Sequence, residues 1–328
     1  MKVCLYGELT SILKGSGIGS AIDHQQKALE LNGVEVTTKY KDQYDLIDIN
    51  TIGPRSAYVA HKMRWRGKPT VIHTHTTVED AKDSFKFSTN LAPKLKGYLK
   101  YFYQQSDLLI SPTEYTKGIL REYGIQKNIE VVSNGVDIKN FTKKSEHSQR
   151  YRKTHGIDGI APYCVAAVFK RKGIVDFMEV AKSSMNKFMW VGRYHKDLVD
   201  KETKKAVEQK PDNVILTGFA KDVVTAHQSG DIFFFPSYCE NQGISILEAA
   251  ACKKPLVLRD LPVYQDWLID GQNCLFAKNN EEFSRHIESL ANDGKKRREM
   301  GKKAYEMAKD HDLKKIGKKL ISVYETVL

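Results

Sequence analysis

The sequence predicts an α/β protein with two doubly wound parallel sheets, one in each of two domains. At 328 residues, the chain is longer than the about 250–300 residues at which a single hydrophobic core stops growing. Short apolar runs alternate with helix-length segments through both halves, which favours parallel strands covered by helices on both faces of each sheet. The charged stretch 143–152 interrupts this alternation. We therefore expect one domain over residues 1–145 and a second over 146–310.

The strands are predicted from short apolar runs that end at polar or turn-forming residues, a pattern typical of buried strands. In the first half these runs are Lys2–Tyr6, Val34–Thr38, Leu46–Asn50, Thr70–His73, Leu108–Ser111 and Ile129–Val132. In the second half they are Tyr163–Ala167, Phe188–Gly192, Val214–Thr217, Ile232–Phe235 and Pro255–Leu258. The predicted helices include Ser20–Asn32, Arg55–Arg66, Glu114–Tyr123, Gly173–Ser184 and Ile244–Lys253, with lysine-rich helices from about Asn279 onward.

Composition narrows the class of protein. The hydrophobic share of 41% is ordinary for a globular chain, and no apolar run approaches the roughly 20 residues of a membrane span. The five cysteines are scattered, without a C-x-x-C pair, so the sequence indicates neither a disulfide framework nor a zinc site. We therefore expect the protein to reside in a reducing cytosol. The net charge of +12 fits an anionic membrane, a nucleic acid or an acidic substrate.

Two glutamates in one short segment indicate the ligand. Glu240 follows the predicted strand Ile232–Phe235 in a loop, and Glu248 lies within the predicted helix Ile244–Lys253. Open parallel sheets bind ligands at the carboxyl ends of strands, beside helix N-termini that attract phosphate. A carboxylate one turn into such a helix repels phosphate but accepts hydrogen bonds from a sugar diol. The segment is therefore predicted to bind a nucleotide sugar, and a chance pair of glutamates is the alternative.

The run from Glu240 to Glu248 resembles the E-x7-E signature of the family 4 retaining glycosyltransferases, which have the GT-B fold. The resemblance covers almost the whole chain. Other segments that match the family pattern are Gly17-Ile-Gly19, Val71-Ile-His-Thr-His75, Asn134-Gly-Val-Asp137, Arg171-Lys-Gly173 and Val214-Ile-Leu-Thr-Gly218. Residues 259–268 and the short length are most similar to the bacterial branch that glycosylates membrane diacylglycerol lipids. The resemblance implies two Rossmann-like domains facing each other across a cleft, with a C-terminal helix over 311–328 that crosses back to the first domain.

Roles for several donor-binding residues follow from this resemblance. Glu240 contacts the transferred sugar, Glu248 holds the ribose hydroxyls, and Gly243 and Ile244 offer backbone N–H groups to the phosphates or the sugar. The family retains the anomeric configuration. Whether Glu240 is a nucleophile or supports an oxocarbenium-like state stays open at this point, and we favour support. The sequence is taken to contain no Asp-x-Asp metal motif, so neither a metal ion nor a cofactor is expected.

Lys172 lies between a predicted strand and a predicted helix, in a Lys-Arg-Lys run. A lysine there can neutralise the diphosphate leaving group, on which negative charge grows as the glycosidic bond breaks. A solvated run of like charges is the alternative. The family commonly has Gly-Arg just upstream, whereas this chain has Ala166-Ala167. Either Arg171 or Lys170 then takes the role of that arginine, or the diphosphate is held by fewer charges.

Two groups in the first half are further candidates. Gly17 and Gly19 lie between the first strand and the first helix, where glycines let backbone N–H groups approach a phosphate or a sugar. Their spacing is not G-x-G-x-x-G, so a turn without a ligand is the alternative. His75 follows a buried strand and could bond the donor sugar or position the acceptor. A structural histidine is the alternative there, and Asn134 and Asp137 are taken to shape a turn.

Cationic side chains gather between residues 51 and 100, where ten basic residues stand against three acidic ones. The membrane-facing candidates among them and their aromatic neighbours are Arg64, Trp65, Arg66, Lys94, Lys96, Tyr98 and Lys100. Basic helices with aromatic residues suit anionic membrane interfaces, although half-buried surface helices have the same pattern. We therefore expect the first domain to dock on the cytosolic leaflet and to take a lipid-linked hydroxyl.

The sequence thus predicts a hexosyltransferase, peripheral on the inner face of the cell membrane. It would move glucose or galactose from UDP-glucose or UDP-galactose to a membrane lipid, a diacylglycerol or glucosyl-diacylglycerol. A cytosolic transferase for a soluble or polyprenyl-linked acceptor of envelope polysaccharide is the alternative. A nucleic-acid partner is suggested only by charge, without an RNA-recognition or zinc signature. The sequence lacks the glycine fingerprint that a nicotinamide oxidoreductase would need. The oligomeric state is left open.

Overall fold

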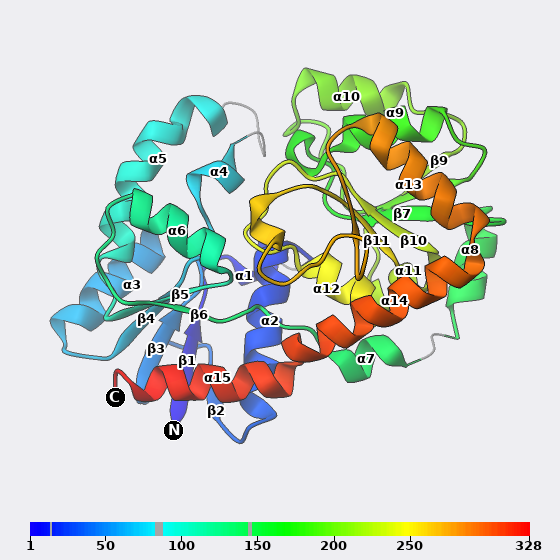
Figure 1. Cartoon of the computed structure of the whole chain (residues 1–328). Coiled ribbons are helices and arrows are strands. Elements are labelled where there is room, and N and C mark those ends of the chain that lie inside the picture. Colours follow the sequence, from blue (N-terminus) through cyan, green and yellow to red (C-terminus); the bar gives the residue numbers. More distant parts are fainter. Residues whose placement is uncertain (14, 83–87, 144–145) are drawn as a thin grey trace. The chain divides into compact units, whose positions relative to one another are not determined.

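The computed structural model describes residues 1–13, 15–82, 88–143 and 146–328, and within them the chain forms two compact units. Unit 1 comprises Met1–Ala81, Asn90–Val136 and His311–Leu328. Unit 2 comprises Asp137–Asp310 and the described residues of Lys82–Thr89. Each unit contains a six-stranded sheet whose paired strands all run parallel. The predicted pair of doubly wound sheets is therefore confirmed, and Figure 1 shows helices around each sheet.

Unit 1 has the strand order β2-β1-β3-β4-β5-β6, which turns back between β1 and β3. The strands are β1 (Lys2–Tyr6), β2 (Glu35–Thr37), β3 (Leu46–Ile49), β4 (Thr70–His73), β5 (Leu108–Ser111) and β6 (Ile129–Val131). The helices are α1 (Thr10–Leu13), α2 (Gly17–Glu30), α3 (Pro54–Trp65), α4 (Val78–Ala81), α5 (Ser88–Tyr103), α6 (Glu114–Glu122) and α15 (Leu313–Glu325). The loops after β1 and β3 thus flank a topological switch point, where open α/β sheets bind ligands.

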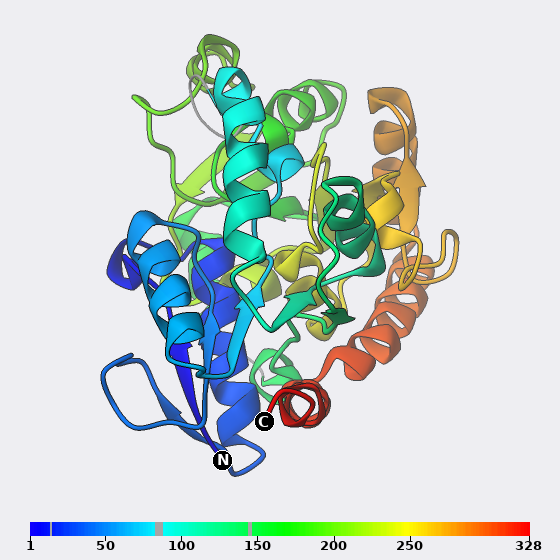
Figure 2. The same cartoon turned by 90° about the vertical axis from the view of Figure 1, so that its left-hand side faces the viewer.

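Both faces of the unit 1 sheet are buried, because successive strand residues point to opposite sides. Val3 and Leu5 pack in one cluster with α2 and α15, whereas Cys4 and Tyr6 pack in a second cluster with α3, α5 and α6. Strands buried on both faces are continuous apolar runs, which is why they were visible in the sequence. In Figure 2, α15 is seen end-on beside both chain termini.

The C-terminal helix α15 belongs to unit 1, as the resemblance implied. It lies against α2, and Gly317 makes the approach possible, since a Cβ there would be 2.0 Å from the carbonyl oxygen of Ala28. Asn32 ties the two helices by donating hydrogen bonds to the carbonyl oxygens of Ala28 and Lys314. The last helix is therefore an integral part of the unit 1 core.

Unit 2 has the strand order β12-β11-β10-β7-β8-β9, which turns back between β7 and β10. The strands are β7 (Pro162–Val165), β8 (Phe188–Val191), β9 (Val214–Gly218), β10 (Ile232–Phe235), β11 (Leu256–Arg259) and β12 (Leu275–Ala277). The helices are α7 (Ile138–Thr142), α8 (Ser148–Thr154), α9 (Ile174–Lys182), α10 (Lys201–Glu208), α11 (Val223–Ser229), α12 (Ile244–Ala251), α13 (Asn280–Asn292) and α14 (Gly294–Ala308). Counted from β9, this is the 3-2-1-4-5-6 order of dinucleotide-binding sheets, whose ligand crevice lies at the switch point.

Aromatic side chains fill both layers of unit 2. Phe234 of β10 stacks on Phe177 of α9 with ring centroids 5.2 Å apart, and Phe283 of α13 packs against it at 5.0 Å. Phe233, the preceding residue, points the other way and contacts Tyr163 of β7 at 5.4 Å. The alternation along β10 therefore builds two separate aromatic cores, one under each helical layer.

Two features of unit 2 differ from the prediction. Strand β12 was not predicted, because three residues are too few to show a periodic pattern. Unit 1 ends at Val136, before the predicted boundary at 145. The reason is α7, where the carbonyl oxygen of Phe141 accepts hydrogen bonds from Gln228 and Cys252 of unit 2. Among the described helices, none combines the length and apolar content needed to cross a bilayer.

The packing of α15 on α2 can be tested with Gly317→Ala. The added Cβ is expected to push the helices apart and to lower the free energy of unfolding by about 1–3 kcal/mol, measured by urea titration. Gly97→Ala in α5 is the matched control, because no atom of the described residues lies within 4 Å of a Cβ there. It should be neutral or stabilise by up to about 1 kcal/mol. Equal destabilisation by both changes would contradict the close approach.

Candidate active site

Three predicted donor-site residues meet at the switch point of unit 2. Arg171 and Lys172 lie in a 3₁₀ turn, η1 (Lys170–Lys172), that follows β7, and Glu240 lies in the loop after β10. The Lys172 Nζ donates to Glu240 Oε1 at 2.5 Å, and the Arg171 Nη1 lies 3.6 Å from the same oxygen. Ser237, which the sequence analysis missed, donates its hydroxyl to this oxygen at 2.5 Å. Both cations therefore form ion pairs with the same carboxylate oxygen, Oε1 of Glu240.

The two loops are held together by their backbones. Gly173 has φ of 76°, and a Cβ there would lie 2.2 Å from the carbonyl oxygen of Pro236, so only glycine lets the loops approach. The amide of Tyr238 donates to the carbonyl oxygen of Arg171 at 2.8 Å. The Arg171 side chain donates to the carbonyl oxygen of Cys239 at 2.7 Å. The Lys172–Glu240 pair is therefore fixed by backbone contacts around it.

Glu240 is ionised in spite of its burial. Burial raises the pKa of this carboxyl, but the charges of Lys172 and Arg171 and the hydrogen bonds from Lys172 and Ser237 outweigh it, so the net pKa lies below the ordinary value. Among the described residues, none donates a hydrogen bond to its second oxygen, Oε2. The site therefore presents one oxygen of a permanent anion, which can stabilise positive charge but cannot act as an acid at neutral pH.

The structure also assigns the other cations near β7. Arg171 is almost fully buried and braces the loop through Cys239, while Lys170 forms an exposed ion pair with Glu202 at 2.6 Å. A cation that the sequence analysis missed is Arg193, which follows β8. Its carbonyl oxygen accepts from the amide of Val168 at 2.9 Å, next to Ala167, and its guanidinium lies 4.4 Å from the ring centroid of Phe219.

Helix α12 carries the remaining predicted donor-site residues. Gly243, with φ of 89°, is the N-cap, and Ile244 is the first helical residue. Glu248 lies inside the helix as predicted and is 6% exposed. Its Oε2 lies 3.1 Å from Nε2 of the fully buried His227. The helix start and the second carboxylate are thus parts of one short element that begins just after Glu240.

In unit 1, Gly17 and Gly19 form the first turn of α2. The hydroxyl of Ser16 caps this helix by accepting from the amide of Gly19 at 3.2 Å. Among the described residues, no atom lies within 4 Å of a Cβ built on Gly17. A side chain would therefore fit in unit 1 itself, and the glycine is not required by the local packing of that unit.

His75 follows β4 and is half-buried. Its Nε2 lies 2.9 Å from Asn50 Oδ1, and its ring stacks on His73 with centroids 5.3 Å apart. Burial and the charge of His73 lower the pKa of His75, so the ring is neutral at physiological pH. Because a carbonyl oxygen only accepts, His75 carries its proton on Nε2 and donates to Asn50.

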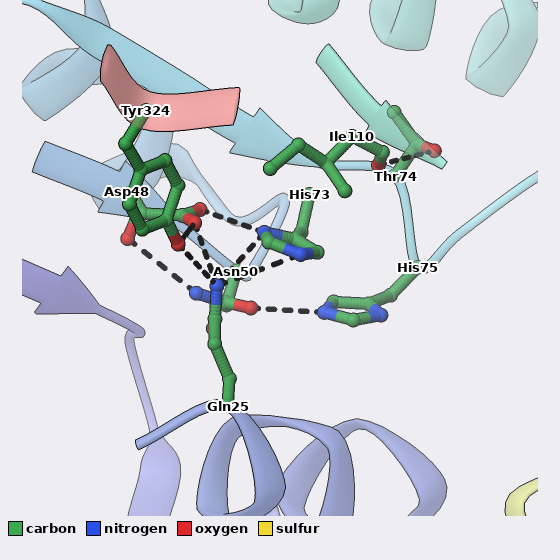
Figure 3. Close-up of polar contacts among 8 residues, drawn as sticks. All are labelled: Gln25, Asp48, Asn50, His73, Thr74, His75, Ile110 and Tyr324. Carbon is green, nitrogen blue, oxygen red and sulfur yellow. Dashed lines mark hydrogen bonds and ion pairs between the residues drawn. The ribbon is translucent and has the colours of Figure 1, made fainter. Parts of the chain in front are cut away.

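A buried polar cluster lies behind this histidine. Figure 3 shows Gln25, Asp48, His73 and Tyr324 pointing toward one another, with His75 and Asn50 beside them. The fully buried Asp48 accepts from His73 Nδ1 at 2.9 Å, from Gln25 Nε2 at 2.6 Å and from the Tyr324 hydroxyl at 2.5 Å. Since Tyr324 lies on α15, the C-terminal helix takes part in fixing the histidine pair.

The predicted membrane-facing residues divide into two groups. Arg64, Trp65 and Arg66 at the end of α3 are exposed, as are the three predicted lysines of α5, Lys94, Lys96 and Lys100. Trp65 is 83% exposed. Tyr98 differs from them, because it packs against the core, stacks on Phe102 and donates its hydroxyl to the carbonyl oxygens of Ile52 and Gly53. Its place is therefore in the packing of α5.

The chain does contain one Asp-x-Asp sequence, Asp310-His311-Asp312, which the sequence analysis overlooked. Asp312 caps α15 by accepting from the amide of Lys314 at 3.0 Å, and the Nδ1 of His311 lies 2.8 Å from the Ser133 hydroxyl. These contacts serve the fold of unit 1. Among the residues that the structure describes, no cluster of His, Cys, Asp and Glu could hold a metal ion.

Comparison with known proteins identifies the class to which this fold and site belong. Residues 31–140 match the family model described as Glycosyltransferase Family 4, and residues 149–307 match the model described as Glycosyl transferases group 1. A solved structure of Anabaena Alr3699/HepE, determined in complex with UDP-glucose, has the same fold. It aligns with a TM-score of 0.80 over 99% of this chain and 100% of that chain, at 16% identity. The fold is that of the GT-B glycosyltransferases, as predicted.

Two curated relatives specify the family. The chain is 37% identical to a processive diacylglycerol alpha-glucosyltransferase of Acholeplasma laidlawii, over 100% of this chain and 99% of that protein. It is 30% identical to an alpha-monoglucosyldiacylglycerol synthase of the same organism, over 75% of this chain and 66% of that protein. The chain therefore belongs to the family 4 glycosyltransferases, which confirms the predicted family.

The ion pair at the switch point can be tested with Lys172→Met. Removing the ammonium leaves a buried carboxylate short of a partner, and the free energy of unfolding is expected to fall by roughly 3 kcal/mol at pH 7.5. The folded-state pKa of Glu240 lies below the unfolded value of 4.5. The pair therefore stabilises the fold above that pH, and this stabilisation is lost as the pH falls through the folded-state pKa.

The matched control is Lys170→Met, which breaks the exposed pair with Glu202 and should cost about 0–1 kcal/mol. Urea titrations of both variants at pH 7.5 and pH 3 measure the difference. A loss for Lys172→Met that is as small as the control, or that is unchanged at pH 3, would show that the pair does not compensate Glu240.

Proposed function

We propose that the protein is a retaining, metal-independent glucosyltransferase that transfers glucose from UDP-glucose to diacylglycerol or glucosyl-diacylglycerol. The observation that carries the proposal is the ionised Glu240, held by Lys172 at the switch point of unit 2. Glucose and the lipid acceptor are supported by the name of the relative that is 37% identical over the whole chain. The nucleotide-sugar donor is supported by the UDP-glucose bound to the structural neighbour. UDP-galactose is the alternative donor.

The proposed donor site binds the two parts of a nucleotide sugar with different groups: cations and backbone amides for the diphosphate, and a carboxylate for the ribose. Lys172 has one of its three N–H groups on Glu240 and directs positive charge at a diphosphate, while the amides at the start of α12 attract its second phosphate. Glu248 accepts hydrogen bonds from the ribose hydroxyls. Arg193, which follows β8, lies beside the segment of Ala167, where the family arginine is missing, because its carbonyl oxygen accepts from the amide of Val168. The positive charge of these side chains takes the place of a divalent cation.

The transfer step uses the fixed charges of the site. As the bond between glucose C1 and the diphosphate oxygen breaks, its electron pair moves to the phosphate and positive charge grows on the sugar ring. Lys172 stabilises the negative charge on the phosphate, and Oε2 of Glu240 stabilises the positive charge on the sugar ring. The acceptor hydroxyl oxygen forms the new bond to C1 on the same face, and its proton moves to the departing phosphate oxygen. Because His75 of unit 1 is neutral, its proposed role is to form a hydrogen bond with the sugar or the acceptor and not to supply a proton.

The acceptor side rests on α3 and α5 of unit 1. Trp65 stands between two exposed arginines, and Tyr58 on the same helix is 60% exposed. An indole flanked by cations inserts at the boundary between headgroups and acyl chains, while the cations attract anionic lipids. We therefore place the enzyme on the cytosolic face of the cell membrane, where its lipid acceptor is found.

A transfer assay tests this function. Wild-type protein is incubated with UDP-glucose or UDP-galactose and with vesicles that contain diacylglycerol, or instead with polyprenyl-linked or soluble acceptors. Glucolipid formation in the presence of EDTA is expected. Product with only polyprenyl-linked or soluble acceptors would favour a role in envelope polysaccharide assembly, and dependence on a divalent ion would contradict the charge argument.

The variant Glu240→Gln keeps the shape of the side chain and removes its charge. Its kcat is expected to fall about 10²–10³-fold with a smaller change in KM for UDP-glucose, because the lost interaction is strongest in the transition state. Glu202→Gln is the matched control, an exposed carboxylate in unit 2 that should leave both constants unchanged. An undiminished kcat for Glu240→Gln would remove Glu240 from the mechanism.

Vesicle co-sedimentation tests the membrane surface. Wild-type protein is expected to bind vesicles with an anionic lipid more tightly than neutral vesicles, with about 1 kcal/mol contributed by each arginine near the surface. The variant Arg64→Gln/Arg66→Gln should lose about tenfold or more of this binding. The control Lys201→Gln/Lys205→Gln removes the same charge from exposed positions of α10 and should not. Equal loss in both variants would point to net charge alone.

A further inference from the structure

A chain of hydrogen bonds lies behind Glu248, on the side of the carboxylate that faces the protein interior. The Oε2 of Glu248 lies 3.1 Å from Nε2 of His227, which is on α11. The Nδ1 of the same ring lies 3.0 Å from the hydroxyl of Tyr163, on β7. Both His227 and Tyr163 are fully buried. Two hydrogen bonds in series thus link β7, α11 and α12 of unit 2, and His227 is the residue that contacts Glu248 directly.

The direction of each hydrogen bond follows from the groups present. An ionised carboxylate only accepts, so Nε2 of His227 carries a proton and donates it to Glu248. Burial raises the pKa of Tyr163 well above its ordinary value, so the phenol keeps its proton and can donate to Nδ1. Tyr163 therefore selects the tautomer of His227 that serves Glu248, in the way that a second group fixes the tautomer of a metal-binding or catalytic histidine.

The surroundings hold this chain rigid. The ring of His227 packs edge-on against Phe141 and Tyr163 with centroids 5.9 Å and 5.6 Å away, and Phe233 lies at 5.8 Å. Gly230 allows Tyr163 its position, since a Cβ there would lie 2.0 Å from the Tyr163 ring. Hydrogen bonds in such an apolar environment are stronger than in water, and leaving one of their members unpaired is costly.

We propose that Tyr163 and His227 are positioning residues that hold Glu248 for recognition of a ribose: Tyr163 orients His227, and His227 binds Oε2 and leaves Oε1 for the sugar hydroxyls. The inference rests on the proposed function, because it takes a nucleotide sugar as the donor. This arrangement sets the specificity of the site. A carboxylate that is fixed by a buried donor loses a hydrogen bond when a ribose hydroxyl is missing. A mobile carboxylate would instead rotate and form that hydrogen bond with water. The enzyme therefore distinguishes ribonucleotides from deoxyribonucleotides.

The test measures binding of UDP, 2′-deoxy-UDP and 3′-deoxy-UDP by calorimetry. Wild-type protein is expected to bind UDP about tenfold more tightly than the weaker of the two deoxy analogues, the value of one good hydrogen bond to a charged group. In His227→Phe, which keeps an aromatic ring, this preference should fall to about twofold or less while the affinity for the deoxy analogues is unchanged. Tyr163→Phe should lose part of the preference. Both variants should raise KM for UDP-glucose with little change in kcat.

Tyr264→Phe is the matched control. Its hydroxyl is buried in the same unit and has no hydrogen-bond partner among the described residues, so its removal should leave the preference intact. For each variant, the affinities for UDP and for the deoxy analogues are measured on the same folded preparation, so that their ratio does not depend on the folded fraction. If His227→Phe does not fold, Tyr163→Phe, which loses a single oxygen, tests the positioning role. A full preference for UDP in the variants would overturn the positioning role and leave the proposed function standing. Wild-type protein without affinity for UDP, or without preference over the deoxy analogues, would overturn the ribose role itself.

Discussion

The compensation of one buried carboxylate oxygen is the constraint on which unit 2 depends. An ionised carboxylate out of water costs several kcal/mol unless donors replace the lost hydration. Oε1 of Glu240 receives Lys172 and Ser237 as donors and the charge of Arg171 beside them. These groups come from the loops after β7 and β10, which are adjacent only because the strand order turns back between those two strands. The topology thus makes it possible to bury an anion whose other oxygen remains available to a ligand.

Asp48 in unit 1 shows the same compensation with a different outcome. Its two oxygens accept three hydrogen bonds from His73, Gln25 and Tyr324, so both are occupied by the protein. The cluster also leaves Oε1 of Gln25 buried without a partner among the described residues, a cost that a purely structural core avoids. The number of oxygens without a protein partner in the described part of the chain separates these carboxylates. Asp48 has none and orients the side chains around it, whereas Glu240 and Glu248 each have one.

The sequence predicted most strands, and it predicted that Glu240 lies in a loop and Glu248 in the helix that follows, because both signals are local. Buried parallel strands are visible as apolar runs, and Glu240 and Glu248 are separated by a single loop–helix junction. The sequence could also have indicated Ser237, which lies within the same loop. His227 and Tyr163 could not be found, because their contacts depend on α11 lying beside both α12 and β7 in the fold. Tyr98 was assigned to the exposed face because composition cannot tell which side of α5 faces the core.

The basic side chains of the chain include a buried, paired group and an exposed group, and salt screens the two groups to different extents. Lys172 and Arg171 are largely buried and paired with Glu240, so mobile ions screen them little. Arg64 and Arg66 stand in solvent, where ions at physiological concentration screen interactions beyond about 8 Å. A net charge of +12 therefore does not describe one basic surface. Salt should therefore weaken the proposed attraction of α3 to an anionic surface at lower concentrations than it weakens the ion pair of Lys172 with Glu240.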